Sequence, residues 1–311
     1  MNILILGAGA IGSLLGARLS RTEASVRLFS TNREHMEAIR EKGLSIEELD
    51  GTVENFRLDT FCDLDHLPRN PDVVLVVVKT YDTEVAVSSI LGLRFPSTIF
   101  LTLQNGIGNF EKIARIVGKD AVLAGSTAQG ATLLEPGAIR HGGNGPTYLG
   151  EPGGLPTERV HRIVEVFRQA GFKADPSDSV ERLIWEKLIV NVGINAITGL
   201  TGIRNGFIAE MREASELCAS AVEEAVLVAR AKGFPIGLEM VERVIGVARA
   251  TARNRSSMGQ DVDKRKRTEI DAINGAIVRF GQEAGIPTPV NQTLTRLVKT
   301  LEANYTVDQA P

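Results

Sequence analysis

The sequence predicts two domains: an N-terminal α/β domain built on a parallel sheet, residues 1–177, and an all-α C-terminal domain, residues 178–311. Three observations predict this fold class. Short apolar runs alternate with helix-like stretches in the first half of the chain, a glycine-rich turn follows the first run, and the second half has the apolar spacing of helices. The 311 residues are enough for each domain to bury its own core, so we expect a cleft between them.

Short apolar runs in the first half predict the strands of the sheet. One of them, Val73–Val78, is apolar without alternation, which is typical of a parallel strand buried on both faces. The same domain should therefore have helices on both sides of its sheet. The other predicted parallel strands are Ile3–Leu6, Val26–Phe29 and Ile99–Leu103.

The pattern changes after a further strand-like run at Val122–Ala124, where the sequence becomes rich in glycine and threonine. Pro136-Gly137 and Gly142-Gly143-Asn144-Gly145 are turn signals of the kind that separate antiparallel strands. We therefore expect Thr127–Leu149 to form a hairpin-type extension of the sheet.

The first domain should end after one more helix, Thr157–Ala170, and a short strand, Phe172–Ala174. The stretch Pro176–Ser179 has the residues of a helix cap, so we place the domain break near residue 177. Beyond it the chain is predicted to be helical, with Gly or Pro between several of the helices. The predicted helices are Val180–Ile197, Ala209–Lys232, Leu238–Ala252, Thr268–Ala284 and Val290–Ala303.

The composition excludes several classes of partner. Hydrophobic residues make up 43% of the chain, charged residues 23%, and the net charge is −3, as in an ordinary globular protein. Because no broad basic field is available for a phosphate backbone, we expect no nucleic-acid partner. The one basic run, Lys264–Arg267, fits a solvated helix end better than a nucleic-acid or targeting patch. Small molecules are the favoured ligands.

The cysteines and histidines carry no recognisable site. Cys62 and Cys218 are far apart and belong to no metal-ligand pattern, so we expect neither a disulfide framework nor a metal, and a reducing cytoplasm. The N-terminus lacks the pattern of a signal peptide, and no apolar run is judged long enough for a membrane span, so we expect no membrane partner. No catalytic role is assigned to the histidines at positions 35, 66, 141 and 161.

A glycine-rich motif, Gly7-Ala8-Gly9-Ala10-Ile11-Gly12, connects the first strand to a helix. Gly7 permits a tight turn, Gly9 lets a pyrophosphate approach the backbone, and Gly12 allows close packing of the helix on the strand. The N-terminus of the helix offers unpaired N–H groups and the positive end of its dipole to the anion. The motif alone is weak, but its place between strand and helix favours a Rossmann-type dinucleotide site over a plain turn.

The choice of dinucleotide is predicted from the end of the second strand. NAD-binding sites place an acid there to accept hydrogen bonds from the ribose 2′-hydroxyl. This chain has Ser30-Thr31-Asn32-Arg33 instead, and an arginine suits the 2′-phosphate of NADPH. NADP(H) is therefore the favoured cofactor, although Arg33 also fits a surface helix beside Glu34.

Polar residues also follow two other strands at the edge where doubly wound sheets bind their ligands. Lys79 comes directly after Val73–Val78, and Gln104-Asn105-Gly106 follows Ile99–Leu103. A solvated strand exit and a simple turn would explain each residue alone. The coincidence of both at one edge favours a functional site.

Lys187, Asn191 and Asn195 are spaced by four residues within an apolar stretch and so share one helix face. An ammonium group and two amides buried without partners would be costly, so this face meets either solvent or a polar ligand. Asparagine is a poor helix former and an unusual choice for a plain surface. This polar ladder therefore predicts a site.

These motifs together resemble the ketopantoate reductase (2-dehydropantoate 2-reductase) family, in the right order over essentially the whole chain. The glycine motif is shared by many dehydrogenases, whereas the ladder and the two motifs that follow it are specific. The resemblance implies a C-terminal domain like that of 6-phosphogluconate dehydrogenase. The motifs are Gly7–Gly12, Gln104-Asn105-Gly106, Trp185-Glu186-Lys187-Leu188 with Asn191 and Asn195, Ser256-Ser257-Met258, and Thr268-Glu269-Ile270-Asp271-Ala272-Ile273-Asn274-Gly275.

The resemblance also implies roles for individual residues, with Lys187 as the proton donor. The residues implied to bind the substrate, besides Lys187, are Asn191, Asn195, Asn205, Ser257, Met258, Gly259 and Gln260. The residues implied to bind the cofactor are Gly7, Ala8, Gly9, Ala10, Ile11, Gly12, Lys79, Asn105, Ala131 and Glu269. Family members commonly place a basic residue directly at the end of the second strand, where this chain has Ser30-Thr31, and this departure weakens the expected preference for NADP.

Plainer interpretations stand beside some of these roles. Ser256 and Ser257 also suit a helix cap or a turn, and Glu269 suits the first turn of a helix capped by Thr268.

The expected reaction is hydride transfer to the keto carbon with Lys187 as general acid, giving pantoate for the synthesis of pantothenate and coenzyme A. A reductase of another bulky 2-keto acid and a non-catalytic NADP(H) sensor are the alternatives. The subunit number stays open, with a homodimer among the options.

Overall fold

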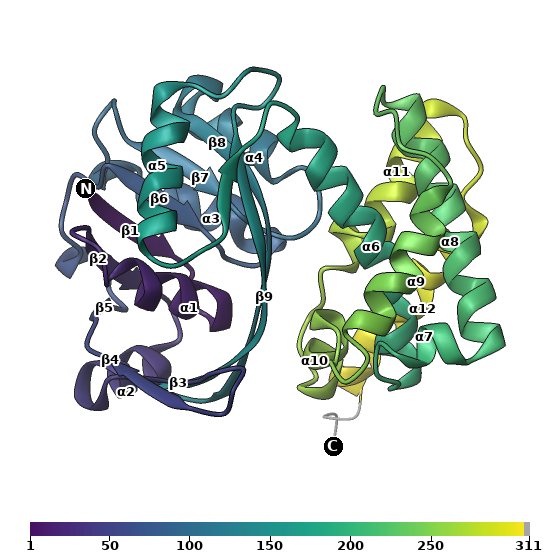
Figure 1. Cartoon of the computed structure of the whole chain (residues 1–311), viewed down its shortest axis with the longest axis horizontal. Helices are drawn as coiled ribbons and strands as arrows, with labels where there is room; N and C mark the ends of the chain where they lie inside the picture. The colour runs from purple at the N-terminus through teal and green to yellow at the C-terminus, as the bar shows by residue number, and fades with distance from the viewer. Residues whose placement is uncertain (308–311) are drawn as a thin grey trace. The chain divides into compact units, whose positions relative to one another are not determined.

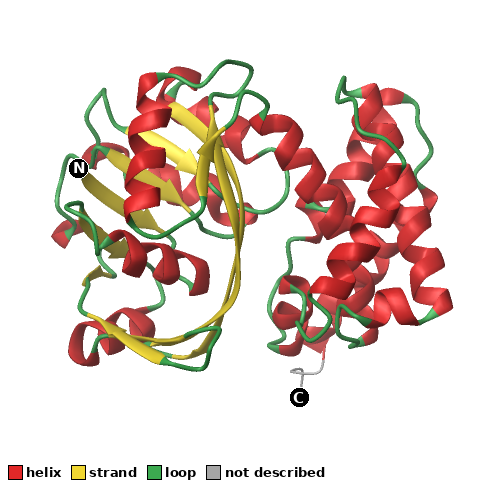
Figure 2. Cartoon of the chain, in the orientation of Figure 1, coloured by secondary structure: helices red, strands yellow, loops and turns green. Residues whose placement is uncertain are grey.

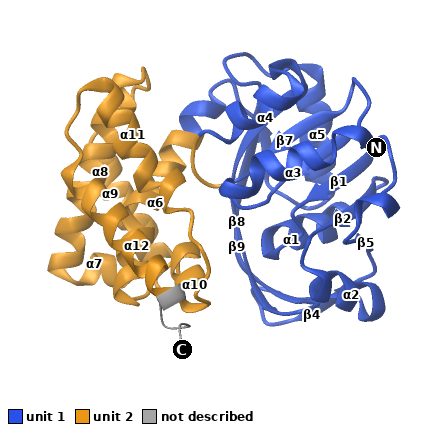
Figure 3. Ribbon diagram, turned by 180° about the vertical axis from the view of Figure 1, so that it is seen from behind, with its two compact units in different colours: residues 1–104, 108–183 blue, residues 105–107, 184–311 orange. Residues whose placement is uncertain are grey.

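The computed structural model describes residues 1–307 and divides the chain into two compact units (Figure 3). Unit 1 comprises residues 1–104 and 108–183. Unit 2 comprises residues 105–107 and the chain from residue 184 onward. A three-residue segment of the first half thus belongs with the helical second half. Contacts between segments that are distant in sequence determine this assignment, so the local sequence pattern could not predict it.

Unit 1 contains a sheet with the strand order β4-β3-β9-β8-β7-β6-β1-β2-β5 (Figures 1 and 2). A tenth strand, β10 (Ala174–Pro176), also pairs with β9. The part from β8 to β5 is parallel and has the doubly wound order 3-2-1-4-5-6, so the α/β prediction is confirmed. The order reverses between β1 and β6, where such sheets bind ligands. The parallel strands are β1 (Asn2–Leu6), β2 (Ser25–Phe29), β5 (Asp59–Phe61), β6 (Val73–Val76), β7 (Ile99–Thr102) and the start of β8 (Val122–Glu135).

Helices cover both faces of this sheet because its strands are apolar on both sides. One core cluster joins β-strand residues such as Ile5 to helix α1, Ala10–Leu19, and helix α5, Glu158–Gln169. A second cluster joins alternate residues such as Leu4 to helix α3, Thr83–Ser89, and helix α4, Asn109–Val117. The buried run at Val73–Val76 contributes to both clusters, as its lack of alternation predicts.

The predicted hairpin is present as β8 and β9 (Ala138–Gly150), with its turn at Pro136-Gly137. The second predicted turn is wrong: Gly142–Gly145 lies inside β9. These glycines accompany a register shift, since Gly130 pairs with Gly143 while Ala131 pairs with His141. A β-bulge, rather than a turn, therefore explains the glycines.

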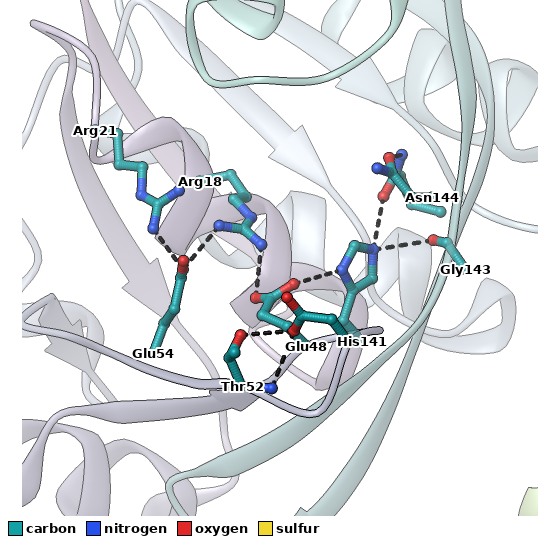
Figure 4. A network of polar contacts seen from close by, with 10 residues as sticks. Arg18, Arg21, Glu48, Thr52, Glu54, His141, Gly143 and Asn144 are labelled. Atoms are coloured by element: carbon teal, nitrogen blue, oxygen red, sulfur yellow. Dashed lines mark hydrogen bonds and ion pairs between the residues drawn. The ribbon is translucent and has the colours of Figure 1, made fainter.

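Three strands were missed by the sequence analysis. The hairpin of β3 (Leu44–Glu47) and β4 (Val53–Phe56) extends the sheet beside β9, and β5 forms its other edge. Figure 4 shows the polar contacts that fix this hairpin to helix α1 and to β9. Arg18 of α1 pairs with Glu48 at 2.6 Å and with Glu54 at 2.9 Å, and Nδ1 of His141, on β9, lies 2.9 Å from Glu48 Oε2. These partners are distant in sequence, so a window of local pattern does not reveal them.

Unit 2 is helical, as predicted, and packs around one apolar cluster that includes Trp185 and Val222. The helix predicted over Thr268–Ala284 is wrong at its start, because a 3₁₀ turn, η5 (Ile270–Ala272), precedes a helix that begins only at Asn274. The short α7 and α10 were not predicted. The helices are α6 (Val180–Thr201), α7 (Phe207–Glu210), α8 (Arg212–Ala231), α9 (Glu239–Ala250), α10 (Ser257–Asp263), α11 (Asn274–Ala284) and α12 (Pro289–Val307).

Helix α6 corrects one expectation about membranes. Within residues 1–307 it alone is long and apolar enough to meet a membrane-span criterion, with a mean hydropathy of 1.3 in its best window. Of that window, 67% is buried inside the protein, as in the core helix of a helical domain.

The basic run at Lys264–Arg267, which was predicted to be a solvated helix end, is exposed at the end of α10.

Candidate functional site

The glycine turn, Gly7–Gly12, connects β1 to α1 at the point where the strand order reverses. Gly7 has φ +104°, and a Cβ there would lie 2.6 Å from the backbone nitrogen of Val78. A Cβ on Gly12 would lie 2.4 Å from the Gly7 carbonyl oxygen. Both positions therefore require glycine, for the reasons of turn and packing that the sequence suggested.

Space for a ligand is found at Gly9. A Cβ built on this exposed residue meets no atom within 4 Å, whereas those on Gly7 and Gly12 collide with the protein. Gly9 precedes α1, whose first-turn N–H groups have no partner within the helix. An open backbone, free donors and a helix dipole fit a pyrophosphate, so the turn suits a dinucleotide.

The end of β2 carries the predicted determinants of cofactor choice. Asn32 is the N-cap of helix α2, Arg33–Lys42, and its side chain accepts a hydrogen bond from His35 N at 3.2 Å. Arg33 is 57% exposed in its side chain and pairs with Asp63 at 3.0 Å, which raises the pKa of the guanidinium. Asp63 was missed by the sequence analysis because it lies thirty residues farther along the chain.

Two further predicted cofactor residues lie in unit 1. Lys79 is half-buried and directly follows Val78, the residue that crowds Gly7. The carbonyl of Val78 accepts a hydrogen bond from Gln104 Nε2 at 2.8 Å, which joins the ends of β6 and β7. Ala131 lies farther along β8, at the bulge opposite His141. The structure thus places Lys79 next to the glycine turn.

The remaining predicted cofactor residues, Asn105 and Glu269, belong to unit 2. Gly106 follows Asn105 with φ +76°, and Ile107 N donates to the Ala272 carbonyl at 3.2 Å. The segment 105–107 therefore packs on the 3₁₀ turn η5, directly after Glu269. The carboxylate of Glu269 is buried, with 7% of the residue exposed.

The polar ladder of Lys187, Asn191 and Asn195 lies along α6 as predicted. Burial lowers the pKa of Lys187 to about 8, while the negative charge of Glu269 acts in the opposite direction. Asn191 Nδ2 is buried and has no hydrogen-bond partner within the described residues. An ammonium group ready to release its proton therefore lies one turn from an unsatisfied donor.

The serine segment, Ser256–Gln260, forms the start of α10. Ser256 is its N-cap and accepts a hydrogen bond from Gly259 N at 3.0 Å, so the plainer interpretation of this serine is confirmed. Ser257 is exposed and accepts from Asn195 Nδ2 at 3.3 Å. Met258 is buried in the apolar cluster of unit 2. Ser257 and Gln260 are thus the members of the segment that present a polar side chain outside the core.

Arg255 holds the serine segment in place and was missed by the sequence analysis. Its Nη1 donates to the Thr198 carbonyl at 2.6 Å and to the Ile203 carbonyl at 3.0 Å, and it pairs with Asp263 at 2.8 Å. Its guanidinium fills the space where Gly259 would carry a Cβ. A lone arginine gives no local signal for such a role, since Thr198 and Ile203 are more than fifty residues away in the sequence.

Asn205 completes the predicted substrate set. Its Nδ2 donates to Thr251 Oγ1 at 3.0 Å, while its Oδ1 is buried without a partner within residues 1–307. Buried polar atoms are rarely left unsatisfied, so the free atoms of Asn191 and Asn205 are places where a polar ligand would fit. Unit 2 therefore offers a proton donor, a hydrogen-bond donor and a hydrogen-bond acceptor.

Two family profiles match the chain. The profile described as "Ketopantoate reductase PanE/ApbA" matches residues 3–154, and "Ketopantoate reductase PanE/ApbA C terminal" matches residues 179–302. The 2-dehydropantoate 2-reductase of Halobacterium salinarum is 38% identical, over 96% of this chain and 98% of its own. That of Archaeoglobus fulgidus is 36% identical, over 97% of this chain and 98% of its own.

Solved structures agree with this relationship. The PanE/ApbA family ketopantoate reductase from Ralstonia eutropha is 30% identical with a TM-score of 0.90, covering 98% of this chain and 100% of that one. A D-mandelate dehydrogenase solved with NADH and anilino(oxo)acetate is 28% identical, with the same TM-score and coverage. The resemblance predicted from the motifs is confirmed, and the chain belongs to the ketopantoate reductase family.

Proposed function

We propose that this protein reduces 2-dehydropantoate to pantoate with NADPH, and that Lys187 donates the proton. The observation that carries the proposal is the ladder on α6, where the half-buried Lys187, with a pKa of about 8, lies one turn from the unsatisfied Asn191 amide. Relatives named 2-dehydropantoate 2-reductase match 96–97% of the chain, which supports this substrate. The product would serve pantothenate and coenzyme A synthesis.

The glycine turn and the end of β2 are the proposed cofactor site. A reduced nicotinamide dinucleotide bound there supplies the hydride that reaches the keto carbon. Gly9 and the N-terminus of α1 would hold the pyrophosphate, and Lys79, beside the turn, would contribute a positive charge. Ala131, Asn105 and Glu269 are carried over from the family resemblance as further cofactor contacts.

NADPH is preferred in this proposal because no acid stands at Ser30–Asn32 and Arg33 is exposed beside them. The pairing of Arg33 with Asp63 weakens the preference, since an incoming 2′-phosphate has to compete with a carboxylate already in place. The related D-mandelate dehydrogenase was solved with NADH, so a protein of this fold can hold the dinucleotide that lacks the 2′-phosphate. We expect a moderate preference for NADPH.

The proton comes from the ammonium group of Lys187. With a pKa of about 8, about nine in ten Lys187 side chains carry the proton at pH 7, and the proton is released far more easily than from an exposed lysine. The charge also stabilises the alkoxide that forms as hydride reaches the carbon. Glu269 keeps the lysine protonated, and solvent returns the proton after each turnover.

The substrate is a short chain with a carboxylate at one end and a hydroxyl at the other. We propose Ser257 and the neighbouring amide of Asn195 for the carboxylate, and the free atoms of Asn191 and Asn205 for the other oxygens. Met258 and Gly259 would support this site through the backbone, because the first is buried in the core and the second is packed against Arg255.

A substrate panel tests the proposal. The loss of NADPH absorbance should be measured with 2-dehydropantoate, 2-ketoisovalerate, pyruvate and phenylglyoxylate, with Lys187→Ala as the inactive control. The highest kcat/KM is expected for 2-dehydropantoate. A higher value for phenylglyoxylate would indicate a reductase of another bulky keto acid, and no turnover with any of them would indicate a dinucleotide sensor.

A cytoplasmic location is part of the proposal and is supported by the free thiols of Cys62 and Cys218.

A further inference from the structure

A buried histidine lies between three segments of unit 1 that the proposed reaction does not explain. His35, on α2, and Ser13, on α1, are both fully buried. Their side chains meet with Ser13 Oγ 2.9 Å from His35 Nε2. The other ring nitrogen, Nδ1, lies 2.9 Å from the backbone nitrogen of Gly137, 102 residues away in the turn of the long hairpin.

The direction of these hydrogen bonds follows from the chemistry of the groups. A backbone N–H can only donate, so Gly137 donates to Nδ1, and Nδ1 carries no proton. Neutral imidazole then has its proton on Nε2, which donates to Ser13 Oγ. The hydroxyl proton of Ser13 is left to point at the Ala8 carbonyl, 3.4 Å away at the long end of the hydrogen-bond range.

The result is a one-way chain of donors from the hairpin turn to the glycine turn: Gly137 N–H to His35, His35 to Ser13, and Ser13 to Ala8. Burial lowers the pKa of His35, which keeps the ring in the neutral form that this chain requires. The backbone N–H of His35 is also bound by Asn32, which caps α2 where the 2′-phosphate of NADPH would approach.

We propose that His35 is a positioning residue for the dinucleotide site, acting through Ser13 on the glycine turn. The inference rests on the proposed function, since it assumes that this turn binds a dinucleotide. Ser13 lies in the second turn of α1, directly after the residues whose free N–H groups would face the pyrophosphate. A fixed Ala8 carbonyl and a fixed second turn hold these donors in one arrangement before the ligand arrives, which lowers the entropic cost of binding.

Two substitutions of His35 distinguish its hydrogen bond to Ser13 from its hydrogen bond to Gly137. A glutamine places its amide N–H near the position of Nε2 and keeps the donor to Ser13, whereas an asparagine places its oxygen near Nδ1 and keeps the acceptor for Gly137. If His35 acts on the cofactor through Ser13, His35→Gln should bind the dinucleotide better than His35→Asn. In a Ser13→Ala background the difference between the two should vanish.

The readouts are the Kd for NADPH, from the fluorescence of the bound reduced nicotinamide, and steady-state kcat and KM. Ser13→Ala and His35→Asn should each raise the Kd and the cofactor KM about three- to tenfold, the effect of losing one hydrogen bond. The keto-acid KM and kcat at saturating NADPH should change less than twofold. Ser20→Ala, which removes a hydroxyl bonded to Ala17 at the other end of α1, and His66→Gln, at an exposed histidine, are the matched controls.

Thermal unfolding of each variant distinguishes positioning from stability. A purely structural histidine predicts that Kd follows the melting temperature, that Gln and Asn behave alike, and that the effects of His35 and Ser13 add independently; any of these results would overturn the proposal. If His35→Asn does not fold, Ser13→Ala alone still tests the link, because an unchanged Kd contradicts it. A wild-type protein that binds neither NADPH nor NADH would reject the proposed function instead.

Discussion

Asn195 donates a hydrogen bond from Nδ2 to Ser257 Oγ across 3.3 Å and thereby connects the polar ladder of α6 to the serine segment of α10. Asn195 is 4% exposed, whereas Ser257 faces outward. The buried amide of Asn195 therefore orients the exposed hydroxyl of Ser257. Because the hydroxyl oxygen accepts this hydrogen bond, the hydroxyl proton can be donated to a ligand. This arrangement suits the proposed role of Ser257 in binding the substrate carboxylate, with Asn195 holding its hydroxyl.

The first prediction concerns this serine. Ser257→Ala should raise the KM for the keto acid about tenfold or more, because a hydrogen bond to a charged group is lost and Asn195 loses its partner. The Kd for NADPH should stay within twofold of wild type. Ser220→Ala, at an exposed hydroxyl on α8 that bonds its own helix, is the matched control. An unchanged keto-acid KM would show that Ser257 is only part of the helix start.

The second prediction concerns the choice of cofactor. Arg33→Ala should weaken NADPH binding about tenfold and NADH binding little, since only NADPH carries the 2′-phosphate. Asp63→Asn should do the opposite and strengthen NADPH binding, because it removes the carboxylate that holds Arg33 at 3.0 Å. Both Kd values should be measured at two salt concentrations, as exposed charges are screened. Equal losses for the two dinucleotides in Arg33→Ala would place the 2′-phosphate elsewhere.

The third prediction concerns pH. Burial lowers the pKa of Lys187 from 10.5 to about 8, and the reaction needs the protonated form, so kcat should fall as pH rises through about 8. Unfolding does not explain this loss: between about pH 8 and 10.5 the folded protein binds fewer protons than the unfolded chain at this group, so Lys187 makes folding more favourable as pH rises there.

Glu269→Gln sharpens this prediction. The negative charge of Glu269 raises the pKa of Lys187 against the effect of burial, so the neutral variant should move the basic limb of the kcat profile to lower pH. Asp271→Asn, two residues away at a carboxylate paired with Lys299, should leave the limb in place. A profile that is the same in Glu269→Gln and wild type would contradict the effect of the Glu269 charge on the proton donor.

The parts of the site that the sequence could predict are those whose members are close together in the chain. The glycine turn and the ladder are each contained in one helix or its approach, so spacing alone places their side chains on one side. Arg255, Asp63 and the His35 contact to Gly137 depend on partners 30 to 102 residues away. No local window contains those pairs.

In the fold, too, the elements with a strong local pattern were predicted and those without one were missed. The apolar parallel strands were predicted, whereas β3 and β4 were missed because four-residue strands with one buried face, such as Leu44–Glu47, give little pattern. The helix predicted through Thr268–Ala284 is interrupted because Ile273 has φ −109° and ψ −97°, outside the helical region. The apolar spacing continues across that interruption, so only the structure shows that the segment 105–107 packs against a turn there.

The last prediction is that Lys187 carries the proton transfer. Lys187→Ala should lower kcat about 10²- to 10⁴-fold, because it removes both a general acid and a positive charge near the forming alkoxide. Lys187→Arg should restore the charge without restoring an acid that releases its proton near neutral pH, so its kcat should stay far below wild type and lose the limb at about pH 8. Lys173→Ala, in unit 1 at an exposed lysine, is the control for loss of a positive charge. The NADPH Kd should be unchanged in all three, since the glycine turn belongs to the other unit. A folded Lys187→Ala variant that binds NADPH and reduces the keto acid at near wild-type rate would move the assignment to Lys79 or Glu269.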